Sequence, residues 1–279
     1  MNDSNQHLLL ISALSASGLI TACGGSSGGG ITGGGGETEP LPPIEPSIQE
    51  GGIWEGTTTA NINSSLLAPE EISLFTTDDG QFRIVGSSAI QASGSTVVAE
   101  GETDADDDVL IGSVTAFAPQ GFFFSDGIET SSCDITAIFA EAESITGTYE
   151  CTDPADNGAF EATYNADQYE QDSSISLVEG TWSGLDANTT NNDVDLTFTV
   201  ADNGSFTGQN SLGCNLIGAI DEIDNDFNLY EIRITLADCA ELNGTYTGLA
   251  TYRPQSNAQD ELFYQVDNGD IILTQVVLR

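Results

Sequence analysis

Strict alternation of apolar and polar residues is the feature that most constrains the fold of this chain. Three runs in the second half show it clearly: Val194, Leu196, Phe198, Val200; then Tyr230, Ile232, Ile234, Leu236; then Tyr246, Gly248, Ala250, Tyr252. Successive side chains of a strand point to opposite faces, so this period of two predicts half-buried β-strands. No segment has a long helical period, and the sequence therefore predicts an all-β protein.

Tight turns separate these runs. Asp202-Asn203-Gly204 and Asp267-Asn268-Gly269 supply the residues that adopt positive φ in hairpins. From Trp182 onward the pattern predicts eight strands, at 181–187, 193–201, 205–211, 213–220, 227–236, 243–252, 260–266 and 271–278. Eight consecutive antiparallel strands favour an up-and-down barrel, because closing the sheet removes its edges. A two-sheet sandwich is the alternative.

An internal repeat predicts two such domains in tandem. Three landmarks of the first half recur in the same order in the second: Gly52-Ile53-Trp54 as Gly180-Thr181-Trp182, Asp78-Asp79-Gly80-Gln81-Phe82 as Asp202-Asn203-Gly204-Ser205-Phe206, and Ile145-Thr146-Gly147-Thr148-Tyr149 as Leu242-Asn243-Gly244-Thr245-Tyr246. The offset falls from 128 to 124 to 97 residues, so the first copy has extra residues before its third landmark. We place the β domains at 51–172 and 173–279, each of ordinary domain size.

The charge is strongly one-sided. The chain has 44 acidic residues against four arginines and no lysine, which gives a net charge of −40. Such a field repels nucleic acid, so nucleic acid is excluded as a partner. A hydrated acidic surface suited to salty surroundings is the favoured interpretation, because salt screens the self-repulsion. Binding of divalent cations and a disordered acidic chain are the alternatives; 39% hydrophobic residues argue against disorder.

The N-terminus carries a targeting signal. Leu8 to Ile20 is an apolar run of thirteen residues, too short to span a membrane as a helix. Ile20-Thr21-Ala22-Cys23 resembles the lipobox of bacterial lipoproteins. That resemblance implies that residues 1–22 are a signal peptide, that Cys23 is acylated, and that Gly24, which is not aspartate, directs the protein to the outer membrane. A secreted protein cut nearby and an uncleaved anchor are the alternatives.

Residues 23–50 have the composition of a tether. Residues 24–36 are mostly Gly and Ser, which predicts a flexible segment, and the prolines that follow between 37 and 46 predict a stiffer spacer. This layout fits a folded part held away from a membrane.

The absence of lysine, and of histidine after position 7, excludes several chemistries. The only histidine, His7, lies in the predicted signal peptide. Ser-His-Asp and Cys-His catalysis, the usual zinc sites and Schiff-base chemistry are therefore excluded. Carboxylate chemistry of the glycosidase kind remains, but no pair can be selected among 44 acidic residues. We expect no enzyme, and we assign no catalytic residue, metal ligand or cofactor.

The Gly-x-Trp at the head of each copy, Gly52/Trp54 and Gly180/Trp182, resembles the lipocalins and related calycin barrels. That resemblance implies that the tryptophan closes the floor of the barrel and that the interior holds a small apolar ligand. It also implies an arginine on a late strand beside the tryptophan. Arg279 is placed for that role in the second copy, and the first copy offers no equivalent.

Four further cysteines predict disulfides, because an exported chain meets an oxidising environment. Four cysteines allow three connectivities. We favour pairing within each copy, Cys133 with Cys151 and Cys214 with Cys239, because the members of each pair are close in sequence.

Two other features could bind a ligand. Asp104-Ala105-Asp106-Asp107-Asp108 and Asp221-Glu222-Ile223-Asp224-Asn225-Asp226 are candidate calcium loops, although neither has the EF-hand glycine and glutamate. Solvated acidic loops are the simpler interpretation. Phe122-Phe123-Phe124 predicts a strand buried on both faces, and the alternative is an exposed patch for a partner.

Together these features predict a lipid-anchored module of the outer membrane with a binding or structural role. The expected partners are the membrane, through Cys23, and a small apolar ligand, a glycan or an envelope protein. No ligand-binding residue can be assigned. The alternatives are a carboxylate-based hydrolase and a calcium-stabilised adhesion module.

Overall fold

A computed structural model describes residues 51–60, 70–86, 91–99, 107–118, 123–124, 127–153, 156–186, 194–256 and 258–279. All of them belong to one compact unit, Ser47–Arg279. The predicted signal peptide, the lipidation site Cys23 and the tether lie outside the described residues.

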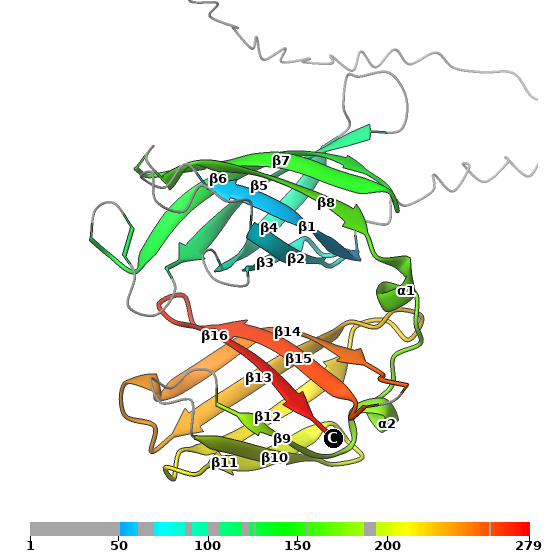
Figure 1. Cartoon of the computed structure of the whole chain (residues 1–279), viewed down its shortest axis with the longest axis vertical. Coiled ribbons are helices and arrows are strands. Elements are labelled where there is room, and N and C mark those ends of the chain that lie inside the picture. Colours follow the sequence, from blue (N-terminus) through cyan, green and yellow to red (C-terminus); the bar gives the residue numbers. More distant parts are fainter. Residues whose placement is uncertain are drawn as a thin grey trace, which may run out of the picture. The chain divides into compact units, whose positions relative to one another are not determined.

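The first eight strands form a closed barrel, barrel 1, in which each strand pairs antiparallel with the next and β1 pairs with β8 (Figure 1). Its strands are β1 (Gly52–Ala60), β2 (Glu70–Thr76), β3 (Gln81–Gly86), β4 (Gln91–Ala99), β5 (Asp107–Phe117), β6 (Thr130–Ala140), β7 (Ser144–Cys151) and β8 (Gly158–Tyr164). The ring closes over seven Cα pairs, from Trp54 opposite Tyr164 to Ala60 opposite Gly158.

Two short helices, α1 (Ala166–Tyr169) and α2 (Ile175–Val178), lead into the second closed barrel, barrel 2. Its strands are β9 (Gly180–Leu185), β10 (Asp195–Val200), β11 (Ser205–Asn210), β12 (Asn215–Glu222), β13 (Tyr230–Ala237), β14 (Gly244–Arg253), β15 (Glu261–Asp267) and β16 (Ile272–Leu278), and η2 (Ala240–Leu242) is a short 3₁₀ turn. The predicted tandem barrels are therefore confirmed, and the sandwich alternative is not needed. In the part of the chain that the structure describes, no helix has the length and apolar character needed to cross a membrane.

Two of the three repeat landmarks are equivalent in the fold. Trp54 and Trp182 lie on the first strand of each barrel, and Gly80 and Gly204 lie in the turn between the second and third strands with positive φ. The third pair is not equivalent: Tyr149 is on the seventh strand of barrel 1, whereas Tyr246 is on the sixth strand of barrel 2. That equivalence was wrong because a Gly-Thr-Tyr pattern suits an inward-facing aromatic on any strand of such a barrel.

Inward-facing side chains fill both barrels, as the alternation predicts. The alternation is clearest on β10, where Leu196, Phe198 and Val200 are buried and the residues between them are exposed. The buried side chains of the barrel 1 core include Trp54, Leu74, Phe82, Ile135, Phe139, Ile145 and Phe160. Those of barrel 2 include Trp182, Phe198, Phe206, Tyr230, Tyr246 and Tyr264.

Two disulfides brace the barrels at different places. Cys133 is bonded to Cys151, its direct partner on the neighbouring strand of the β6–β7 pair. Cys214, just before β12, is bonded to Cys239, just after β13. This is the within-copy pairing expected from the sequence. The bridges join the sixth and seventh strands of barrel 1 but the fourth and fifth of barrel 2, so they do not descend from one shared position.

Candidate functional site at the contact between the barrels

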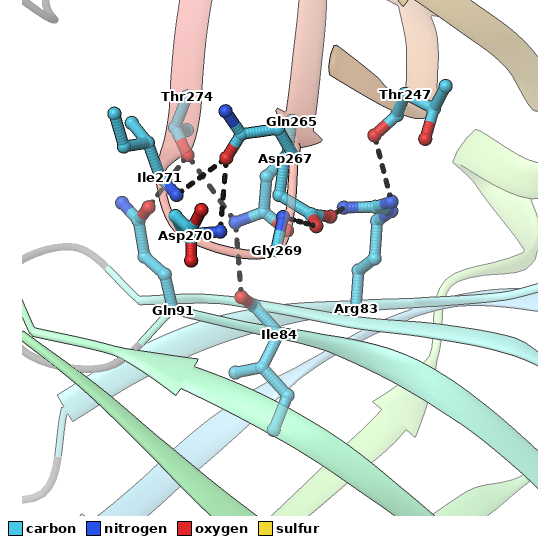
Figure 2. Close-up of polar contacts among 11 residues, drawn as sticks. Arg83, Ile84, Gln91, Thr247, Gln265, Asp267, Gly269, Asp270, Ile271 and Thr274 are labelled. Atoms are coloured by element: carbon cyan, nitrogen blue, oxygen red, sulfur yellow. Dashed lines mark hydrogen bonds and ion pairs between the residues drawn. The ribbon is translucent and has the colours of Figure 1, made fainter. Parts of the chain in front are cut away.

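Several polar side chains on the outer faces of the strands are buried where the two barrels meet, among them Arg83 and Gln265. Arg83 on β3 of barrel 1 points across the contact toward β14 and β15 of barrel 2 (Figure 2). Its Nη1 donates to Asp267 Oδ2 at 2.8 Å and its Nη2 donates to the Thr247 carbonyl at 3.1 Å. The side chains are only 8% and 16% exposed, so this ion pair is largely shielded from water.

Gln265 forms a second polar link. Its Nε2 donates to the Ile84 carbonyl at 3.2 Å and lies 3.4 Å from Thr274 Oγ1 (Figure 2). Thr274 Oγ1 in turn donates to Gln91 Oε1 at 3.0 Å. Arg83 and Gln265 therefore each donate a hydrogen bond from one barrel to a backbone carbonyl of the other.

An apolar cluster continues the same contact. It comprises Ile53, Phe75, Tyr169, Leu229, Leu249 and Phe263. The Phe75 and Phe263 rings are stacked, 5.5 Å apart and inclined by 13°. Burial of these outward-facing rings favours association of the two barrels through the hydrophobic effect.

Burial sets the electrostatics of this contact. Desolvation lowers the pKa of Arg83, and the charge and hydrogen bond of Asp267 oppose that shift. Arginine remains protonated under any ordinary condition, so Asp267 compensates a fixed positive charge. Because an unpaired buried charge is costly, the pair favours the arrangement in which Arg83 and Asp267 meet.

The floor of barrel 2 is closed by a tryptophan and an arginine. The Arg279 guanidinium lies over the Trp182 ring, 4.6 Å from its centroid, and donates to the Glu179 carbonyl. Trp182 Nε1 donates to the Val178 carbonyl at 2.7 Å, which ties the ring to the end of α2. Arg279 lies beside Trp182, although it follows β16 (Ile272–Leu278) instead of lying on it, and the calycin kinship stays a prediction.

The floor of barrel 1 is built differently. Trp54 Nε1 donates to Thr76 Oγ1 at 3.1 Å, and the Tyr164 ring lies 5.1 Å from the Trp54 ring. Tyr164 takes the place beside the tryptophan that Arg279 takes in barrel 2. Burial raises the pKa of Tyr164, and Glu170 adds to that shift, so the ring remains neutral.

Aromatic contacts span the interior of both barrels. The Trp54 and Phe139 rings are 5.3 Å apart, although β1 and β6 are not neighbours around barrel 1. In barrel 2, Phe198 on β10 lies 6.4 Å from Tyr264 on β15, and these strands are not neighbours either. Packed aromatic pairs have centroids about 4.5–7 Å apart, so these contacts leave no room for a ligand at the same level.

The inward face of barrel 2 becomes polar away from Trp182. Asn210 Nδ2 donates to Asp186 Oδ2 at 3.0 Å, and Gln275 Nε2 donates to the Leu185 carbonyl at 2.6 Å. Burial raises the pKa of Tyr264, and the Asp186 carboxylate adds to this shift. This polar end could accept hydrogen bonds but does not suit an apolar ligand.

The candidate calcium loops do not form a metal site in the described residues. Asp104 to Asp106 lie outside those residues, and Asp107 and Asp108 begin β5 instead of lying in a loop. In the second loop, Asp224 Oδ1 accepts from the Asp226 backbone N–H at 2.9 Å, a bond that shapes the turn. No group of three or more acidic, histidine or cysteine residues is placed to hold a metal ion in the parts that are described.

The phenylalanine run also differs from the prediction. Phe122 lies outside the described residues, and neither Phe123 nor Phe124 is in a strand. Phe123 is 58% exposed, whereas Phe124 is buried. The strand prediction was wrong because Phe124 belongs to a turn, in which it accepts from Gly127 N–H and donates to the Ile128 carbonyl.

One carboxylate pair lies in a groove, as a hydrolase would require. Asp221 and Glu231 are direct partners on β12 and β13 and line the same depression. Both are exposed, whereas the general acid of such an enzyme usually lies in a shielded pocket. The arrangement therefore provides charge for binding more readily than acid catalysis.

Sequence reasoning did not single out Arg83, Gln265 or Asp267. The available signals were an arginine within the apolar run Phe82-Arg83-Ile84-Val85 and the unbroken apolar run Leu262-Phe263-Tyr264 on a strand otherwise expected to alternate. Both signals mark strand faces that are buried on the outside of a barrel as well as inside it.

Comparisons with known proteins do not assign this chain to a family. No protein-family model matches the sequence, and no curated protein matches it. Among solved structures, the Aeromonas veronii immune modulator A is 11% identical with a TM-score of 0.37, over 82% of this chain and 94% of that one. A candidate outer membrane protein from Bacteroides fragilis is 12% identical with a TM-score of 0.28, over 81% and 95%.

Proposed function

We propose that this protein is a lipid-anchored module of the outer membrane that acts through the outer surface of its joined barrels and catalyses no reaction. The observation that carries the proposal is the filled interior, shown by the Trp54–Phe139 and Phe198–Tyr264 contacts across the two lumens. A carrier of small apolar ligands needs a cavity in the barrel interior, where these aromatic side chains lie. The remaining roles are binding of a partner at the surface and a structural role in the envelope.

The lipobox-like sequence Ile20-Thr21-Ala22-Cys23 supports the location in this proposal. The acyl chains of a lipoprotein bind firmly, because each buried methylene adds about 0.8 kcal/mol. The net charge of −40 keeps the folded part away from anionic surfaces, so attachment depends on the lipid and not on protein charge.

The anchor is tested by growing producing cells with radioactive palmitate and comparing wild type with Cys23→Ala. We expect label in the wild type and none in the variant. Gly24→Asp is the matched control, which should keep the label but move the protein to the inner-membrane fraction. Label that survives Cys23→Ala would overturn lipid attachment at this residue.

A further inference from the structure

A groove beside the contact between the barrels combines both signs of charge. It encloses about 470 Å³ and is lined by Gln81 of barrel 1 and by Asp221, Glu231, Ile232, Arg233, Thr247 and Gly248 of barrel 2. Asp221, Glu231 and Arg233 are exposed and lie on adjacent strands. Arg233 is notable because it is one of only four basic residues in a chain with 44 acidic ones.

The two carboxylates of the groove face each other on neighbouring strands. Asp221 and Glu231 are direct partners across the β12–β13 pair, a position in which like charges repel. Glu231 Oε1 accepts from Gln81 Nε2 at 3.2 Å. Neither carboxylate belongs to either of the two ion pairs found among the described residues. A bound ammonium group would relieve this repulsion.

Arg233 supplies the positively charged arm of the groove, and Asp221 and Glu231 form the negatively charged arm. It lies on the same face of β13 as Glu231, two residues along, and directly opposite Thr247 of β14. Its guanidinium has no hydrogen bond or ion pair within the described ranges, whereas the neighbouring Arg83 already binds Asp267 and the Thr247 carbonyl. A guanidinium beside a hydroxyl supplies hydrogen-bond donors for a carboxylate.

The charges of the whole protein narrow the class of ligand. A simple anion is repelled by the net charge of −40, and a simple cation leaves Arg233 facing the same space unpaired. A small zwitterion satisfies both arms at once. We propose that this groove binds a small molecule that carries one ammonium and one carboxylate group, with the ammonium between Asp221 and Glu231 and the carboxylate on Arg233 and Thr247.

This site does not depend on lipid attachment and would stand if Cys23 were not acylated. It is tested by isothermal titration calorimetry of the full-length protein in detergent. Glycine, β-alanine and 4-aminobutyrate serve as zwitterions of increasing charge separation, and methylammonium and acetate serve as single-charge controls. We expect one member of the zwitterion series to bind about threefold to fivefold more tightly than either control, and more weakly as salt rises.

Variants of the two arms should give opposite patterns. Arg233→Gln should weaken zwitterion binding about threefold to fivefold and strengthen methylammonium binding. Glu231→Gln should weaken zwitterion binding to a similar extent and strengthen acetate binding. Glu241→Gln, an exposed carboxylate outside the groove, is the matched control and should change nothing.

Three results would overturn the proposal: no heat with any of the three zwitterions, methylammonium binding as tightly as the best zwitterion, or zwitterion binding unaffected by Arg233→Gln. The second would mean that the groove is a simple cation site. Because all the substituted side chains are exposed, an unchanged unfolding transition of each variant will show that the fold is retained.

Discussion

Joining the two barrels removes the charged side chains of Arg83 and Asp267 from water, which costs desolvation free energy. Their charges are 2.8 Å apart and largely shielded from water. Removing one partner of a buried pair costs more than the pair contributes, because the other charge is left without compensation. The pair therefore contributes mainly specificity of docking, and the apolar cluster around Phe75 and Phe263 contributes the larger share of the association energy.

We expect Asp267→Asn to lower the free energy of unfolding by about 2–4 kcal/mol, because it strands the buried Arg83 charge. Arg83→Met combined with Asp267→Leu should recover most of that loss, since it removes both charges. Urea unfolding followed by circular dichroism measures all three proteins. If the double variant were as unstable as Asp267→Asn, the loss would not arise from an uncompensated charge.

A second prediction concerns Asp260 at the floor of barrel 2. Its carboxylate accepts from the Tyr252 hydroxyl at 2.8 Å, from the Gln255 backbone N–H at 3.2 Å and from Arg279 at 3.2 Å. These bonds, with the Tyr252 hydroxyl first, lower the pKa of Asp260. The unfolded chain takes up the proton first, at a pKa of about 3.9, so this group stabilises the fold above that pH and loses its effect as the pH falls further.

We therefore expect acid to reduce the stability of wild type more than that of Asp260→Asn. The difference between the two melting temperatures should shrink as the pH falls below about 4. Thermal scans at a series of acidic pH values give this comparison. A constant difference across the series would show that the titration of Asp260 does not contribute.

At the scale of elements, the sequence predicted the strands well, but it did not predict which outer strand faces are buried against the other barrel. All eight predicted strands of barrel 2 are present, because alternation and Asp-Asn-Gly turns are local signals. β14 and β15 are buried on both faces over five consecutive residues, which alternation alone could not show. Which outward face is covered depends on the other barrel. The contacting residues are 150 positions apart in the chain for Gln81 and Glu231 and 184 apart for Arg83 and Asp267.

The candidate sites also divide into those that local sequence predicts and those that depend on contacts between the barrels. The cysteine pairs are close in sequence and could be matched by proximity, and the place of Arg279 beside Trp182 was implied by a resemblance. The groove residues Gln81, Glu231 and Arg233 come from two domains, so no sequence spacing connects them. The prediction of a buried phenylalanine strand was wrong because a run of three apolar residues is too short for periodicity to identify a strand.

The disulfides give a prediction at this scale. Replacing both cysteines of either bridge with alanine should lower the free energy of unfolding by about 3 kcal/mol, because the unfolded chain regains the entropy of a closed loop. The loops span 18 and 25 residues, so the two losses should be similar. Urea unfolding of the two double variants provides the measurement, and a loss near zero for either bridge would contradict the stabilising role assigned to it.

At the scale of the whole molecule, charge dominates the response to solvent. With 44 acidic and four basic residues, most carboxylates have no cation to pair with. We expect the melting temperature to rise with sodium chloride, because screening shortens the range of repulsion to about 10 Å at 0.1 M and less above it. Potassium chloride is the matched control and should act equally. A flat or falling response to both salts would mean that the acidic surface has another role.

The central claim is that both barrels are filled and that the protein acts from its outer surface. X-ray diffraction from crystals pressurised with xenon tests it most directly, since xenon enters empty apolar cavities. We expect no xenon site inside either barrel, and aromatic side chains in contact across both lumens. Xenon or a co-purified apolar molecule bound above Trp54 or Trp182 would contradict the account and restore an internal ligand site.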